Sequence, residues 1–394
     1  MGESILSNTA FQMSLLMFVA IAGYLIAYRI NQSAVVGIII AGIIVGPSLL
    51  GWVTYTDFVS TLGNLGAVVL LFTIGLEFSL KDILKVRYFL IALCGVIVPA
   101  ICGYFLAVLF GYDFKASIII GTALTATSIA ITANVLREMG KLKTETAKAI
   151  IGAAVIDDVL ALLALSVSKG LVSGDLSAAN ITIAAAKAVG FLVIAVLVGR
   201  FLLSRLMLYL DKTKIAAKYP ESLFIFAIMV AFFYATMAEL IGLSAIVGSF
   251  LAGASLEGAK MMRGKVFKEG AEHLQIIFAS IFFVSLGVIM DFHAVNVSLI
   301  CFILALSAVA ILTKIIGCGL TALVQRMSIK DSIIVGTGMV PRGEVAMIVA
   351  LIGLNQGIIN QSAYSALVLM SLITTIIPPI ALRNWLYKDS RQVI

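Results

Sequence analysis

The chain has 394 residues, of which 62% are hydrophobic and 12% are charged. This composition excludes an ordinary soluble domain, in which about half of the residues are apolar and about a quarter are charged, and it indicates a protein of the lipid bilayer. The formal net charge of +7 would suggest a nucleic-acid partner in a soluble protein, but here the basic residues lie in short loops, so we expect no nucleic-acid binding.

Apolar runs of about 20 residues, the length of a membrane-spanning helix, recur along the whole chain. The least certain boundary lies in the long apolar stretch 220–256, which we divide at Gly242 because its length fits two short spans. The predicted spans are 9–29, 34–50, 60–80, 88–110, 116–137, 144–170, 180–204, 220–240, 242–258, 273–292, 296–325, 331–354 and 361–385.

The charges of the loops give an orientation. With the division at Gly242, basic loops such as those of Lys141 and Lys212 all fall on one side of the membrane, and the opposite loops hold little beyond Lys115 and Lys169. Cytoplasmic loops are the basic ones. We therefore predict a multi-pass protein of the cell inner (plasma) membrane, with its N-terminus outside and its C-terminus in the cytoplasm.

Three short motifs recur in the same order in the two halves of the chain, at separations of 207, 212 and 215 residues. They predict two six-helix repeats joined by a linker helix, and the helix count gives the two repeats inverted topology, which is typical of secondary transporters. The pairs are 45–51 with 252–258, 71–75 with 283–287, and 121–124 with 336–339.

The fifth and twelfth predicted spans are the most polar and the least regular. The fifth contains Thr127 and Ser128, and the twelfth contains Gly338, Pro341 and Gly343 within six residues, which would break a helix. Broken helices at corresponding places of two repeats indicate a binding site near the middle of the membrane. The alternative is a pair of kinked helices whose hydroxyl groups bond to their own backbone.

Two adjacent carboxylates, Asp157 and Asp158, lie within an apolar run that has no other charge between Lys148 and Lys169. A charge at membrane depth is costly and usually serves an ion or proton pathway. Neighbouring helical residues point about 100° apart, so the two carboxylates face different surroundings. Small residues on the side of Asp157 would let another helix approach, so we expect Asp157 to meet a partner side chain. The alternative is a pair of buried structural carboxylates.

Lys314, Arg342 and Glu344 are further charges inside predicted spans. Lys314 is too far from Arg326 to be a loop residue, and a buried lysine needs a carboxylate partner, for which Asp157 is the candidate. The alternative is that its long side chain reaches the membrane surface. Arg342 and Glu344 are expected to be structural charges near the crossing helices, paired with each other or with the ends of the broken helix.

Four motifs together resemble the cation/proton antiporter superfamily, and within it the NapA-type bacterial sodium/proton antiporters, with the glutathione-gated potassium efflux transporters as more distant relatives. The resemblance covers nearly the whole chain. The motifs are 153–159 (Ala-Ala-Val-Ile-Asp-Asp-Val), 125–130 (Thr-Ala-Thr-Ser-Ile-Ala), 282–287 (Phe-Phe-Val-Ser-Leu-Gly) and 341–344 (Pro-Arg-Gly-Glu).

The resemblance implies an all-α polytopic membrane protein of about thirteen helices, embedded in membrane lipids as a homodimer. Its helices 5 and 12 would be unwound and would cross near the ion site, and its core would move like an elevator. The implied domains are a dimerisation domain of residues 1–87 and 220–293, a core or transport domain of 88–170 and 294–394, and a linker helix within 171–219.

The resemblance also assigns the site. The ion-binding aspartate of the superfamily matches Asp158, and its lysine-paired aspartate and its lysine match Asp157 and Lys314. Asp158 is thus the expected Na⁺ ligand and Asp157 a second candidate, with hydroxyl oxygens from Thr127 and Ser128. A hard cation such as sodium takes oxygen ligands, and protons would compete for the same carboxylates.

The predicted function is sodium (or lithium)/proton antiport that exchanges cytoplasmic Na⁺ for external protons and is electrogenic. Lys314 and the end of the chain at Ile394, without the long nucleotide-binding extension of the potassium-type relatives, favour sodium. The alternatives are a potassium/proton antiporter and a passive cation channel. An intramembrane aspartyl protease is disfavoured, since its two aspartates lie on separate helices, so we expect no enzyme and no cofactor.

Overall fold

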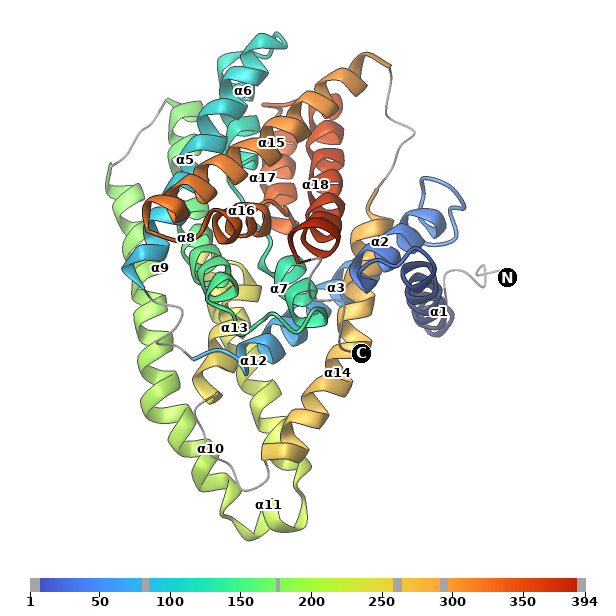
Figure 1. Ribbon diagram of the computed structural model, residues 1–394, viewed down its shortest axis with the longest axis vertical. Coiled ribbons are helices and arrows are strands. Elements are labelled where there is room, and N and C mark those ends of the chain that lie inside the picture. Colours follow the sequence, from blue (N-terminus) through green and yellow to red (C-terminus); the bar gives the residue numbers. More distant parts are fainter. Residues whose placement is uncertain (1–7, 80–84, 175–177, 258–263, 291–296, 388–394) are drawn as a thin grey trace. The chain divides into compact units, whose positions relative to one another are not determined.

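The computed structural model describes residues 8–79, 85–174, 178–257, 264–290 and 297–387, and the regular secondary structure within these ranges is helical (Figure 1). Among the described residues, nine helices are long and apolar enough to cross a membrane, and four shorter apolar helices accompany them. The predicted all-α membrane class is therefore confirmed. The number of thirteen spans stays a prediction.

The chain folds into two compact units. Unit 1 comprises residues 1–30, 37–83 and 186–289, and unit 2 comprises residues 31–36, 84–185 and 290–394. The helices of unit 1 are α1 (Thr9–Arg29), α2 (Ala34–Val45, of which 34–36 belong to unit 2), α3 (Asp57–Gly75), α9 (Ala178–Val198, from 186 onward), the π-helical segment η2 (Gly199–Leu203), α10 (Ser204–Asp211), α11 (Lys214–Lys218), α12 (Glu221–Ile241), α13 (Ala245–Leu256) and α14 (Gly264–Val288).

Helix α3 is central to unit 1 and packs against α13 and α14. Its C-terminal half is buried on all sides, and glycines allow the backbones to meet. A Cβ atom on Gly75 would clash with the carbonyl oxygen of Phe250, and one on Gly253 would clash with that of Phe72. Small residues at helix crossings are a usual means of packing in membranes.

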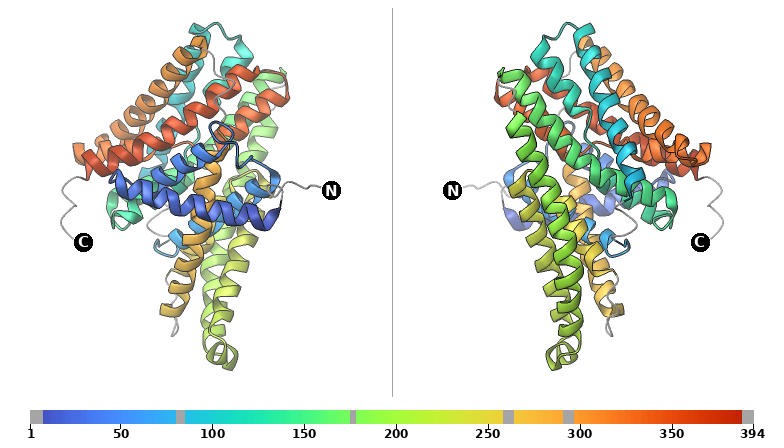
Figure 2. Two further views of the ribbon diagram at one scale, coloured as in Figure 1. Left: turned by 90° about the vertical axis from the view of Figure 1, so that its right-hand side faces the viewer. Right: turned by 90° about the vertical axis from the view of Figure 1, so that its left-hand side faces the viewer.

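Unit 2 contains the same order of elements twice, a long helix, a broken one and a second long helix. Figure 2 shows these helices from two further sides. The first set is α5 (Val86–Leu109), α6 (Phe114–Ala123), α7 (Ile129–Glu138) and α8 (Glu145–Ser173), and the second is α15 (Val297–Val324), α16 (Ile329–Gly338), α17 (Glu344–Asn355) and α18 (Gln361–Ala381), which ends in the π-helical η3 (Leu382–Leu386).

Side chains placed before the first turn begin several of these helices. Asp113, Thr144, Ser328 and Asn360 each accept a hydrogen bond from the backbone N–H three residues later, at the start of α6, α8, α16 and α18. Such caps satisfy N–H groups that have no partner inside the helix. They therefore determine the residue at which each of these four helices begins.

Most predicted spans are observed within a few residues, and the exceptions have clear causes. Helix α2 ends at Val45 rather than at residue 50, because Pro47 cannot continue a helix. Helix α14 begins at Gly264 rather than at 273, because a helix can extend past its apolar part. The division at Gly242 is confirmed: its φ of 94° is a left-handed conformation that ends α12. Predicted ends at residues 80, 258, 292 and 296 lie outside the described residues.

Candidate functional site

The fifth predicted span is broken in its middle. Helix α6 ends at Ala123 and α7 begins at Ile129, so residues 124–128 leave the helix. Ser128 stands at the start of α7 with extended backbone angles, and its side chain makes no cap. The break therefore leaves carbonyl groups at the end of α6 and N–H groups at the start of α7 for other partners.

The twelfth predicted span is broken in the same way. Helix α16 ends at Gly338 and α17 begins at Glu344, with Pro341 and Gly343 between them. A Cβ atom on Gly343 would lie 2.8 Å from the Ser128 hydroxyl oxygen, so glycine is what allows the two breaks to come this close.

Backbone groups of each break bond to the other. The N–H of Ser128 donates to the carbonyl of Pro341 at 2.7 Å, and the hydroxyl of Thr132 donates to the carbonyl of Gly338 at 2.6 Å. Irregular backbone at membrane depth needs such internal partners. The predicted crossing of the two broken helices is thus observed, and simple kinking is excluded.

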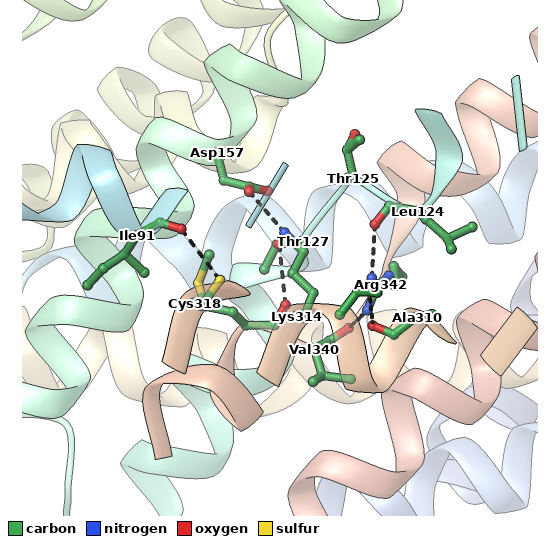
Figure 3. Close-up of polar contacts among 12 residues, drawn as sticks. Ile91, Leu124, Thr125, Thr127, Asp157, Ala310, Lys314, Cys318, Val340 and Arg342 are labelled. Atoms are coloured by element: carbon green, nitrogen blue, oxygen red, sulfur yellow. Dashed lines mark hydrogen bonds and ion pairs between the residues drawn. The ribbon is translucent and has the colours of Figure 1, made fainter. Parts of the chain in front are cut away.

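Beside the crossing lies a buried ion pair between α8 and α15. Lys314 Nζ lies 3.0 Å from Asp157 Oδ1 and donates a second hydrogen bond to Thr127 Oγ1 at 2.7 Å (Figure 3). The exposed fractions of the lysine and aspartate side chains are 0% and 1%. The predicted pairing is present, and a lysine that reaches the membrane surface is excluded.

Two oxygens at the crossing are buried without a hydrogen-bond partner among the described residues, Asp157 Oδ2 and Ser128 Oγ. A buried polar atom usually has a partner, and one that lacks it indicates a missing ion or water. Both atoms are hard oxygen donors, the kind that sodium prefers. The donor set therefore fits a monovalent cation.

The other predicted residues take different positions. Asp158 follows Asp157 on α8 and is half-buried. Thr127, expected as an ion ligand, accepts a hydrogen bond from Lys314 and donates a long one of 3.4 Å to the carbonyl of Met339. The side chain of Glu344 lies outside the described residues, so its predicted pairing with Arg342 is left open.

Arg342 bonds to the ends of the broken helices, the second of the two partners predicted for it. Its guanidinium donates to the carbonyls of Leu124 and Val340, which follow the last turns of α6 and α16, and 1% of the residue is exposed (Figure 3). Helix C-termini carry partial negative charge, so one cation stabilises both ends. Thr375 in turn donates to the Arg342 carbonyl at 2.7 Å.

Replacing Arg342 by methionine is expected to lower the thermal stability of the purified protein. The change leaves two buried carbonyls without their donor, a loss of about 2–6 kcal/mol if each unsatisfied group costs about 1–3 kcal/mol. Thermal unfolding in detergent measures it, and Arg205→Met is the matched control because Arg205 is exposed on α10. Equal melting temperatures for both variants would contradict the role of Arg342 in stabilising the ends of the two broken helices.

A search for known families gives a match over almost the entire chain. The family described as "Sodium/hydrogen exchanger, transmembrane" matches residues 15–388. This chain is a sodium/hydrogen exchanger family member. The crossing of the broken helices thus occurs in a member of this family. The same holds for the buried ion pair and for the adjacent carboxylates.

Two curated relatives of this exchanger are similar over nearly their full length. It is 34% identical to the Na⁺/H⁺-K⁺ antiporter GerN of Bacillus cereus, with 94% of both chains covered. It is 33% identical to a Na⁺/H⁺ antiporter of Enterococcus hirae, with 92% of this chain and 94% of that protein covered.

A solved structure shares the fold of the exchanger. The sodium proton antiporter MjNhaP1 of Methanocaldococcus jannaschii superposes with a TM-score of 0.75 at 17% identity, covering 98% of each chain. At this identity the likeness concerns the fold alone, and it agrees with the predicted arrangement of helices.

Proposed function

We propose that this exchanger is a secondary active transporter that moves Na⁺ or Li⁺ out of the cytoplasm in return for external protons. The observation that carries the proposal is the buried contact of Asp157 with Lys314 next to the crossing. The second Asp157 oxygen and the Ser128 hydroxyl, both buried, have no hydrogen-bond partner within the described part of the chain. Curated relatives of similar length bear the name of Na⁺/H⁺ antiporters.

Competition for carboxylates couples the two ions. Asp158 takes the role of the main cation ligand, because one oxygen of Asp157 is already bonded to Lys314. Burial disfavours a bare carboxylate, so the site holds either a proton or a cation. If the site crosses the membrane only when its charge is neutralised, each cation that leaves is exchanged for protons that enter.

The two units take different parts in this cycle. Unit 2 holds the crossing and the ion pair, so we assign it the role of the transport domain that moves like an elevator. Unit 1 then provides the contact of a homodimer in the membrane lipids. The basic loops support an orientation with the C-terminus in the cytoplasm and the N-terminus outside the plasma membrane.

A buried lysine beside Asp157 favours sodium as the cargo, as the resemblance to the antiporter superfamily implies. The alternative is potassium/proton exchange, and the name of the GerN relative includes both ions. The adjacent carboxylates lie on one helix, α8, and not on two facing helices as in a membrane aspartyl protease.

Flux measurements in proteoliposomes test the function. A pH gradient is imposed with the dye inside, and NaCl, LiCl, KCl or choline chloride is added outside. We expect sodium and lithium to dissipate the gradient and choline to leave it intact. An equal response to potassium would shift the assignment to the alternative. A cation current without proton movement would indicate a channel and overturn the proposal.

A further inference from the structure

The buried ion pair lies near α5 at Gly95. A Cβ atom built on Gly95 would lie 3.5 Å from Lys314 Nζ and 3.7 Å from Asp157 Oδ1, which is ordinary contact distance. A methyl group at this position would therefore just contact the charged atoms. Gly95 itself is buried.

One atom leaves no room for a side chain at Gly95. The same Cβ atom would lie 2.6 Å from the sulfur of Cys318, about 1 Å closer than carbon and sulfur pack in protein interiors. Cys318 is completely buried, and its thiol points to the carbonyl of Ile91 at 3.5 Å (Figure 3). The thiol thus fills the seam between α5 and α15.

The spacing of residues on α5 and α15 places the contact between Gly95 and Cys318 next to the ion pair. Ile91 and Gly95 are four residues apart on α5, and Lys314 and Cys318 are four residues apart on α15. Residues with this spacing lie next to each other on one helix face. A displacement of Cys318 away from α5 therefore carries Lys314 in the same direction, away from Asp157.

We propose that Gly95 is a positioning residue of the exchanger: the space left by its missing side chain lets α15 bring Lys314 against Asp157 and Thr127. This inference rests on the proposed function and adds to it that Lys314 carries one of the transported protons. The glycine touches neither cation nor proton. It acts through the position of the ammonium group.

Gly95→Ala is expected to displace the pair, and a second substitution is expected to restore it. Overpacking at a buried contact disturbs its neighbours, so the variant should transport sodium about tenfold more slowly and lose most of the wild-type response to membrane voltage. In Gly95→Ala/Cys318→Ala the close contact is gone, and only the contacts at 3.5 Å and 3.7 Å remain. Rate and voltage response should return to within about threefold of wild type.

The main readout is the ratio of sodium-dependent proton fluxes at two potassium–valinomycin potentials. A variant that merely folds less well loses flux equally at both potentials, so its ratio does not change. Gly190→Ala is the matched control, since a Cβ atom there would meet nothing within 4 Å, and Cys318→Ala controls for the thiol. Both should behave like wild type.

The outcomes separate this inference from the proposed function. Wild-type protein without sodium-dependent flux would overturn the function. Wild-type flux together with an unaltered Gly95→Ala variant, or a double variant no better than the single one, would overturn the positioning role alone. If transport by wild type does not depend on voltage, the half-saturating sodium concentrations of the variants are compared instead. Gly95→Ala should then differ from wild type, and the double variant should return to the wild-type value. If Gly95→Ala does not fold, a folded double variant with wild-type behaviour supports the role, and an unfolded one overturns it.

Discussion

Replacing Asp158 by asparagine is expected to abolish sodium-dependent proton flux while leaving a folded protein. Asp157 is bonded to Lys314 through one oxygen, so Asp158, the next residue on α8, is the second carboxylate through which the cation and protons compete. Asparagine has nearly the same size but neither binds a proton nor supplies negative charge. The coupling of the two ions therefore disappears without a change of volume.

The measurement compares purified Asp158→Asn with wild type in proteoliposomes at several sodium concentrations. Asp57→Asn serves as the matched control, because Asp57 is exposed at the start of α3 in unit 1. We expect the control to exchange ions at the wild-type rate and Asp158→Asn to match empty liposomes. Sodium/proton exchange by Asp158→Asn near the wild-type rate would show that Asp158 is not the coupling carboxylate.

The sequence predicts the fold well where single residues cause a helix to end or break. Pro341 and Gly343 cannot continue a regular helix, and the break between α16 and α17 lies at these residues. The break between α6 and α7 has no such cause, since residues 124–128 contain neither glycine nor proline. Bonds from outside hold it open, such as the one from Arg342 to the Leu124 carbonyl. The polar residues of this span and its correspondence with the other broken span indicated it.

The part of the site that depends on pairing of opposite charges could be predicted from the sequence. A lysine and an aspartate inside one apolar bundle gain most by meeting, so the contact of Lys314 with Asp157 could be inferred from composition alone. Which hydroxyl receives the second lysine bond depends on packing, and Thr127 was therefore assigned to the ion instead. Gly95 gave no signal, because the chain has 33 glycines.

Lys314→Gln is expected to remove the electrogenic part of transport. We propose that in wild type a cation that enters the site adds positive charge beside Asp157 and weakens its contact with Lys314, so that the lysine releases a proton. Two protons would then move for each sodium ion, one from the lysine and one from the carboxylates, and net charge would cross the membrane. Glutamine keeps most of the length of the side chain but cannot titrate. The variant should be inactive or exchange one proton per ion without a response to voltage.

The same substitution is expected to destabilise the protein. Removing one partner of a buried ion pair leaves an uncompensated charge and typically costs about 3–5 kcal/mol. The side chains of Lys314 and Asp157 are almost completely buried, so the full penalty applies. A second change, Asp157→Asn, removes the stranded carboxylate and should recover part of the loss in melting temperature. Lys187→Gln is the matched control, since Lys187 is exposed on α9.

The voltage dependence of transport shows whether Lys314 carries a second proton. Transport by wild type, Lys314→Gln and Lys187→Gln is measured in proteoliposomes clamped at several potassium–valinomycin potentials. If the lysine carries a proton, wild type and the control accelerate with voltage of the appropriate sign, and Lys314→Gln does not. Wild-type flux that ignores voltage, or a Lys314→Gln variant that is fully electrogenic and as stable as wild type, would falsify this role. Asp158 would then be the only group that couples protons to sodium, and the contact of Lys314 with Asp157 would serve only to hold α8 and α15 together.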